Sequence, residues 1–207
     1  PLQRTPSYTR LRQAWASSLN TRRLERALAL TDGHWSAPYE LLDREGGLHA
    51  PWASVRLRPD RDALQLDLAL SDLDLPRQPA WRADGGGVLI TLMSPADPQT
   101  GEGTQFVDLG FGLLDGLPTG AIRLGQRWQQ LAELSPKLKV DHEKQQLHMT
   151  MRIPWDACQP FHPLADTDLA VNITYVQPHD GRQQKAALLA DPSQGLPQHP
   201  WRRGVPM

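Results

Sequence analysis

The chain has 207 residues and a formal net charge of −1, so it lacks the excess of basic residues from which nucleic-acid binders draw their affinity. Its single cysteine, Cys158, excludes an intrachain disulfide and a zinc site built on cysteines. It contains no apolar run of about 18 residues, the length expected of a membrane-spanning helix. The length suits one large domain, or one domain with an appendage.

Residues 8–30 carry the spacing of a helix. Leu11, Ala14, Trp15 and Leu19 recur at intervals of three and four, and Asn20 could cap a second short helix. We therefore expect residues 1–30 to form an N-terminal helical extension or linker. Because the sequence starts with Pro rather than Met, we interpret it as a mature or excised chain whose targeting segment, if any, is gone.

From residue 51 onward the sequence predicts β-strands. Apolar and polar residues alternate with a period of two, which places one side chain of each pair in the core and the next in solvent. Five segments show this pattern or follow directly from a turn signal: 53–57, 64–70, 88–92, 147–153 and 169–175. Clusters of Pro, Gly and Asp separate them, as is typical of an antiparallel sandwich or barrel. The side chains expected to be buried are Leu66, Leu68, Met149, Met151, Val171 and Ile173.

Familiar catalytic motifs are missing from the sequence, which has no G-x-S-x-G elbow, P-loop or H-E-x-x-H helix. The triple glycine at 85–87 lacks the Lys and Ser/Thr of a phosphate cradle, so we interpret it as a tight turn or a close backbone approach. Two pairs of acids, Asp72 with Asp74 and Asp141 with Glu143, have the residue types of a glycosidase, but acids in turns are usually solvated turn formers. A structural calcium ion on such loops stays open, with no ligands assigned.

Six segments carry a resemblance when they are taken in order: 31–35 (TDGHW), 53–57 with 60–72, 81–84 before the strand at 88–91, 147–155 ending in RIPW, 168–175, and 191–193 with 200–202. Together they resemble the family 9 carbohydrate-binding modules and the wider DOMON-like superfamily. The Ile153-Pro154-Trp155 strand end is the most specific of these segments. The resemblance implies an all-β fold over residues 31–207, an antiparallel β-sandwich of jelly-roll or immunoglobulin-like type. Residues 1–30, where the spacing predicts short helices, lie outside the resemblance.

The resemblance also implies a ligand site. Two tryptophans of that family sandwich a sugar ring, and the matching positions here are Trp81 and Trp201. Sugar rings have apolar C–H faces that pack on flat aromatic side chains, while planar polar side chains bind the hydroxyls. The alternative is that both indoles pack at the rim of the core. Trp155 and Trp35 are predicted to lie in the core.

The sequence departs from the family at two polar positions. The acidic residue of the strand that follows the first tryptophan falls on Gly87, and the arginine that follows Gln-Phe falls on Val107. Gln198 and Arg202 are the replacements that we expect to contact a ligand together with the two tryptophans. The ligand therefore differs from the glycan end usual in the family, or the site has been lost.

These observations predict non-catalytic binding or sensing of a carbohydrate, with no nucleic-acid partner and no cofactor. We expect a periplasmic or extracellular location and a fusion to a membrane or signalling domain, such as a sensor kinase. The alternative is a haem-binding electron-transfer domain of the same superfamily, for which Met93, Met149 and Met151 offer axial ligands. A third hypothesis is an interaction domain without a small ligand.

Overall fold

The computed structural model describes residues 30, 33–43, 49–71, 73, 75–82, 85–93, 106–159, 170–179, 182–187 and 205–206. The predicted N-terminal helices lie outside these residues, so the division at residue 30 stays a prediction. No membrane-spanning helix is found in the described ranges.

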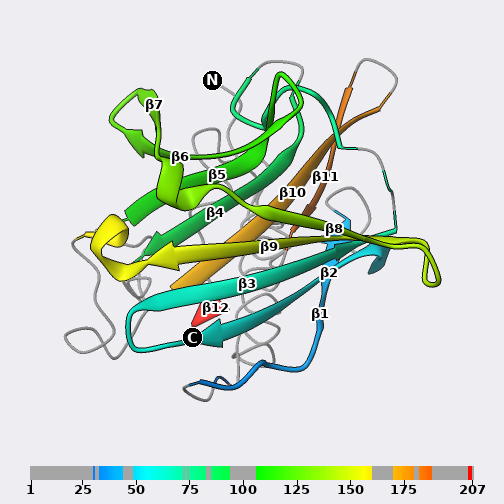
Figure 1. Ribbon diagram of the computed structural model, residues 1–207, viewed down its shortest axis with the longest axis horizontal. Helices are drawn as coiled ribbons and strands as arrows, with labels where there is room; N and C mark the ends of the chain where they lie inside the picture. The colour runs from blue at the N-terminus through cyan, green and yellow to red at the C-terminus, as the bar shows by residue number, and fades with distance from the viewer. Residues whose placement is uncertain are drawn as a thin grey trace, which may run out of the picture.

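The described residues form an all-β, two-layer antiparallel sandwich, which confirms the predicted fold class (Figure 1). The strands are β1 (Tyr39–Asp43), β2 (His49–Pro59), β3 (Ala63–Leu70), β4 (Gly87–Met93), β5 (Phe106–Leu114), β6 (Leu117–Leu124), β7 (Arg127–Gln130), β8 (Lys137–Asp141), β9 (Gln146–Pro154), β10 (Ala170–His179), β11 (Arg182–Ala187) and β12 (Val205–Pro206). The helical turns in these ranges are two short 3-10 segments, η1 (Ala132–Leu134) and η2 (Trp155–Cys158).

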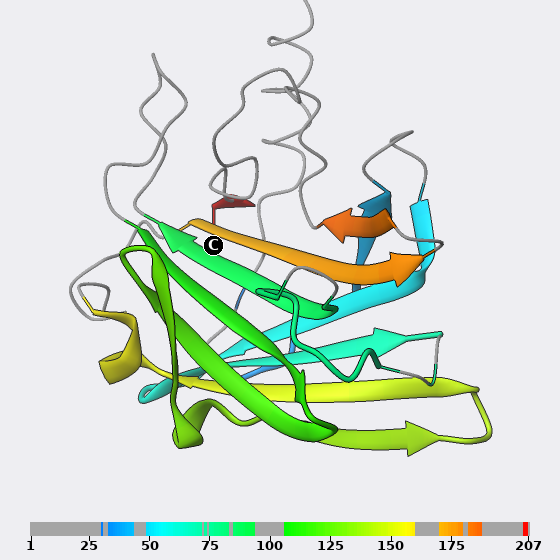
Figure 2. The ribbon, with the colours of Figure 1, turned by 90° about the horizontal axis from the view of Figure 1, so that it is seen from above.

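Hydrogen bonds join the strands in one continuous path, in the order β7-β6-β5-β4-β10-β11-β1-β2-β3-β9-β8, with β12 paired to β10. The path passes from one layer of the sandwich to the other through β11 and β1. Strands β10 and β4 consequently lie in one layer and strands β3 and β9 in the other (Figure 2). Each layer buries one face against the other, because alternate side chains of a strand point to opposite faces.

The core between the layers is apolar and includes all six side chains predicted to be buried. Leu66, Leu68, Met149, Met151, Val171 and Ile173 have no solvent exposure. They come from strands β3 and β9 of one layer and β10 of the other, so the period-two pattern correctly identified which face of each strand points inward. Leu109 and Phe111 of β5 extend the same core toward β6.

Trp155 is a core residue, as predicted, and is 3% exposed. Its Nε1 donates a hydrogen bond of 3.0 Å to the backbone carbonyl of Asp60, and its own amide donates to the carbonyl of Asp62. The indole therefore links the start of η2 to the turn between β2 and β3. A polar N–H that is buried in this way is satisfied, which allows the large ring to remain inside.

Trp35 does not lie in the core, and that prediction is wrong. Its indole is half-buried on the outside of β2, where the guanidinium carbons of Arg56 and Arg58 lie 5.4 Å and 5.0 Å from the ring centroid. The two arginines occupy alternate, outward positions of β2 and so reach the same indole. The segment around Trp35 runs beside β2, since the Ser36 amide donates to the Leu57 carbonyl and Ser36 Oγ accepts from the Leu57 amide.

We predict that Trp155→Ala lowers the free energy of unfolding by about 3–5 kcal/mol, the usual effect of emptying a large aromatic core site. Chemical denaturation measures this directly. Trp35→Ala is the matched comparison and should have a clearly smaller effect, because that indole is only half-buried. Equal effects of the two substitutions would contradict the assignment of Trp155 to the core.

Candidate functional site

The turn before β4 is held tightly against the sheet, and this turn carries Trp81. The Arg82 amide donates to the Pro79 carbonyl, and the Gly86 amide donates to the Gln78 carbonyl at 2.9 Å. A Cβ on Gly85 would overlap the Pro79 backbone, so only glycine fits. Gly87 has a positive φ of 132° and lies against the Phe111 carbonyl. The interpretation of the triple glycine as a close backbone approach is confirmed.

Trp81 lies on the outer face of the layer formed by β10, β4, β5, β6 and β7, not in the core. Its partner there is Trp128 of β7, with ring centroids 5.4 Å apart and an angle of 24° between the ring planes. Both indoles are half-buried. A Cβ on Gly110 of β5 would overlap the six-membered ring of Trp81 and approach Trp128 within 3.2 Å. The edges of both indoles therefore pack directly against the backbone of Gly110.

A row of polar residues crosses the same face next to the indole pair. In the strand register Asn172 of β10 lies opposite Thr91 of β4, Thr91 opposite Asp108 of β5, and Arg123 of β6 opposite Trp128. Their neighbours along the strands, such as Ile90 and Leu109, point into the core. The row thus belongs to the outer face, although Thr91, Asp108 and Asn172 are themselves buried.

Asp108 is the charged centre of this row. It is 4% exposed, its Oδ1 accepts a hydrogen bond of 2.7 Å from the Thr91 hydroxyl, and its Oδ2 lies 3.4 Å from Nη1 of Arg123. Arg123 Nε donates to the Gly125 carbonyl at 3.0 Å, which fixes the guanidinium at a second point. The carboxylate is balanced by one cation, so the row contributes no net charge to the face.

The described geometry accounts for only part of the predicted site. Trp81 is on the surface side of the sheet, where a ligand can reach it, while Trp201, Gln198 and Arg202 lie outside the described residues. Their role as ligand contacts, and the pairing of Trp81 with Trp201, stay predictions. The Trp81–Trp128 pair is too close to hold a sugar ring between its members, since two stacking contacts of about 3.5–4.0 Å would need a wider gap. A ring would stack on the outer side of the pair.

Sequence reasoning did not identify Trp128, Arg123 or Asp108. Trp128 lies in the four-residue strand β7, which is too short to show a period. The arginine expected from the family falls on Val107, a core position, but its neighbour Asp108 points to the outer face. Gly87, at the position of the family's acidic residue, has no side chain that could join the row of polar residues. The clue in the sequence was the alternation of Val107, Leu109 and Phe111, which places Asp108 and Gly110 on the other face.

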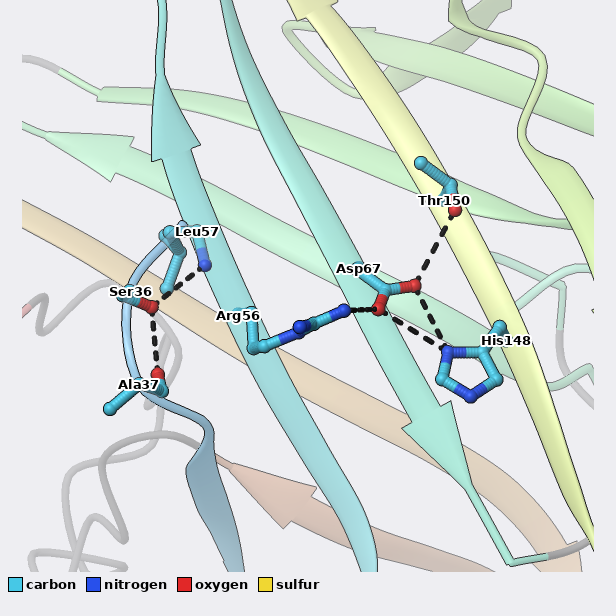
Figure 3. A network of polar contacts seen from close by, with 7 residues as sticks. All are labelled: Ser36, Ala37, Arg56, Leu57, Asp67, His148 and Thr150. Atoms are coloured by element: carbon cyan, nitrogen blue, oxygen red, sulfur yellow. Dashed lines mark hydrogen bonds and ion pairs between the residues drawn. The ribbon is translucent and has the colours of Figure 1, made fainter. Parts of the chain in front are cut away.

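The other layer has a polar network on its own outer face, built around Asp67 of β3 (Figure 3). Arg56 Nη2 lies 2.7 Å from Asp67 Oδ2, His148 Nδ1 lies 3.3 Å from both carboxylate oxygens, and the Thr150 hydroxyl donates to Oδ1 at 3.4 Å. The guanidinium groups of Arg56 and Arg58 lie over the ring of Trp35 on the same face. These contacts link β2, β3 and β9.

Catalytic and metal-binding alternatives find little support in the described residues. Asp72 and Asp74 lie outside them. Asp141 is a turn former, because its carboxylate accepts hydrogen bonds from the amides of Lys144 and Glu143, and the Lys144 amide is the main cause that lowers the pKa of Asp141. The residues described include no group of three or more His, Cys, Asp or Glu side chains that could hold a metal ion.

The sulfur atoms of Cys158, Met149 and Met151 lie in the core. Burial raises the pKa of Cys158 to about 12, so the thiol stays protonated and is a poor nucleophile. Met149 and Met151 are fully buried between the layers, where they pack against other apolar side chains. Neither thioether reaches a surface on which a haem could lie. The side chain of Met93 lies outside those that the structure describes, so the haem-binding alternative stays a prediction.

Comparison with known proteins finds similarity among solved structures. No protein-family model matches the sequence, and no curated protein matches it. The chain is similar in structure to family 9 carbohydrate-binding modules. One is a module from Caldicellulosiruptor kristjanssonii in complex with glucose, with a TM-score of 0.45, 14% sequence identity, and coverage of 66% of this chain and 65% of that one. Another is such a module from the same organism in complex with cellotriose, with a TM-score of 0.46, 14% identity, and coverage of 66% and 64%. The match thus spans less than two thirds of those chains.

We predict that the Trp81–Trp128 contact gives an exciton couplet in the circular dichroism spectrum, because two indoles at this distance couple their transitions. Trp81→Phe and Trp128→Phe should each remove the same couplet. Trp155→Phe, which changes a buried indole away from the pair, should leave it in place. A couplet that survives both of the first two substitutions would show that the indoles are not stacked in solution.

A second prediction concerns Gly110. Gly110→Ala should destabilise the protein by about 1–3 kcal/mol, as overpacking does, because the new methyl group overlaps the Trp81 ring. In a Trp81→Ala background the same change should cost clearly less, since the ring is gone. A double-mutant cycle from denaturation curves measures this coupling. Additive effects would mean that Trp81 does not rest on Gly110.

Proposed function

We propose that this protein binds a carbohydrate without catalysis, and that the ligand packs on the Trp81–Trp128 pair. The observation that carries the proposal is the stacked, half-buried indole pair on an outer sheet face beside Arg123 and Asp108. A flat apolar surface next to planar polar groups matches a sugar ring, which has C–H faces and a rim of hydroxyls. The resemblance of the sequence motifs to carbohydrate-binding modules supports the same class of ligand.

The physical chemistry of the face favours binding over reaction. Asp108 lies 3.4 Å from Arg123 and accepts a hydrogen bond from the Thr91 hydroxyl, so both of its carboxylate oxygens already have partners within the protein. General acid–base catalysis would require a carboxyl group that can exchange a proton with the ligand. A carboxylate held by a cation and a hydroxyl donor orients groups rather than transferring protons.

We further propose that Trp201, Gln198 and Arg202 complete the site from the C-terminal part of the chain, as the sequence motifs predict. Trp128 covers one side of Trp81, and a sugar between Trp81 and Trp201 would use the opposite side. We also propose a periplasmic or extracellular location and a sensing role within a larger protein, in keeping with a module that binds and does not react.

We predict that glucose and cellotriose bind in the micromolar to millimolar range, because one or two stacking contacts and a few hydroxyl hydrogen bonds give affinities of about that size. Trp81→Ala should abolish measurable binding and leave the melting temperature within a few degrees. Trp128→Ala should weaken binding by about tenfold, since it removes the support of Trp81. Isothermal titration calorimetry with thermal melts measures both properties.

Trp35→Ala is the matched control, because it removes a half-buried indole from the opposite layer. It should bind both sugars like the parent protein. Loss of binding in Trp35→Ala with retention in Trp81→Ala would move the site to the other layer and refute the proposal. A glycan array on which the parent protein binds no carbohydrate would refute the ligand class.

A further inference from the structure

The two charges of the Asp108–Arg123 pair lie at different depths beside the indoles. The side chain of Arg123 is 22% exposed, and that of Asp108 is 5% exposed. The positive end of the pair therefore faces a ligand, and the negative end lies behind it. We propose that the site prefers acidic sugars, and that Arg123 binds the carboxylate of a uronic acid unit. The inference rests on the proposed function and names the class of sugar for the same site.

Arg123 has hydrogen-bond donors left for a ligand. A guanidinium offers five N–H donors in a fixed fork. Nε of Arg123 donates to the Gly125 carbonyl at 3.0 Å, and Nη1 lies 3.4 Å from Asp108 Oδ2, while Nη2 has no partner among the described residues. Because two contacts already hold the group in place, a ligand carboxylate can accept from Nη2 with little further loss of side-chain freedom.

The guanidinium lies within reach of a sugar on the indole pair. Arg123 is directly opposite Trp128 in the register of β6 and β7, on the same outer face. Side chains paired in this way have Cβ atoms about 5 Å apart. A pyranose unit packed against the solvent side of Trp128 therefore brings the groups at its rim to Arg123. In glucuronic acid one of these groups is a carboxylate, where glucose has a hydroxymethyl group.

The other charges of this face favour an anion as well. Among the outward positions described in β10, β4, β5, β6 and β7, the one acid is Asp108, and both of its oxygens are engaged by Thr91 and Arg123. The turn that carries Trp81 adds a second cation, Arg82, which is exposed and has no ion pair with a described residue. No free carboxylate of the described strands thus competes with a ligand for Arg123.

The sign of the net effect follows from the distances. A carboxylate bound to Nη2 makes a charge-assisted hydrogen bond of about 2.8 Å, whereas Asp108 lies beyond the guanidinium by a further contact of 3.4 Å. Because the Coulomb energy falls with distance, attraction by the nearer cation exceeds repulsion by the farther carboxylate. A sugar hydroxyl gains less from the same donor, since it carries no charge.

The test compares methyl glucuronide with methyl glucoside, which differ by a carboxylate against a hydroxymethyl group, by titration calorimetry at neutral pH and low salt. The parent protein should bind the glucuronide about tenfold more tightly. Arg123→Gln keeps a planar polar group but removes the positive charge. It should abolish the preference, mainly through a loss of affinity for the glucuronide.

Asp108→Asn tests the pair from the other side. It keeps the shape of the side chain and an oxygen that accepts from the Thr91 hydroxyl, but it removes the farther negative charge. The preference for the glucuronide should therefore increase by about threefold over the parent value. The two substitutions shift the selectivity in opposite directions, and either one tests the proposal if the other fails to fold.

Arg127→Gln is the matched control. It removes the same charge from β7 beside Trp128, at an exposed position whose side chain alternates to the other face of the strand. The ratio of the two affinities should stay at the parent value. A fall as large as that in Arg123→Gln would show a general effect of charge and refute a contact at Arg123.

The outcomes separate this inference from the proposed function. If the parent protein binds the glucoside as tightly as the glucuronide or more tightly, or if Arg123→Gln and Asp108→Asn leave the ratio unchanged, the preference for acidic sugars is wrong and carbohydrate binding stands. If the parent protein binds neither sugar and no other glycan, both are wrong.

Discussion

The close approach of backbone to backbone around the glycines of β4 and β5 is the constraint on which the candidate site depends. A Cβ on Gly85 would overlap the Pro79 backbone within the turn that carries Trp81, and a Cβ on Gly87 would overlap the Phe111 carbonyl of β5. Gly110 lets the indole rest on the strand surface. A single methyl group at any of these positions would overlap neighbouring atoms and push the contacting segments apart. The aromatic surface therefore lies over positions without side chains, and the contacts beneath it are closely packed.

Both outer faces of the sandwich contain tryptophan, arginine and aspartate, but these residues make different contacts on the two faces. In the layer of β2, β3 and β9, two arginines lie over the ring of Trp35. Figure 3 shows the buried Asp67 of the same layer with its arginine, histidine and threonine partners. In the opposite layer, Trp81 lies against a second indole, and the arginine and aspartate stand beside the pair. In the first arrangement the contacts of the indole are with two cations, and in the second the indoles stack on each other with a polar pair beside them. That difference is why the second face is the better candidate for a sugar.

The sequence predicted the core strands well because their signal is local. Strands β3 and β9 alternate strictly, so Leu66 and Met149 could be placed inside from their neighbours alone. Strand β6 escaped notice because it contains Pro118 and Gly120, which are ordinarily turn signals. The stacked pair was beyond reach for a different reason. Trp81 and Trp128 are brought together by the pairing of β5 with β6 and of β6 with β7, and register is not encoded in either segment by itself. Trp35 was wrongly predicted to lie in the core. Its position outside depends on contacts with Arg56 and Arg58 of β2, which are distant in sequence and do not show in the segment around Trp35.

The central claim is that a carbohydrate packs on Trp81 and Trp128, and the indole N–H signals of the seven tryptophans test it most directly. Two-dimensional ¹⁵N NMR during a titration with cellotriose, with signals assigned by single Trp→Phe variants, follows each indole separately. The account predicts that the signals of Trp81 and Trp128 shift together and saturate, while that of Trp155, bonded inside the fold to the Asp60 carbonyl, stays in place. Saturating shifts at Trp35 with none at Trp81 and Trp128 would contradict the account.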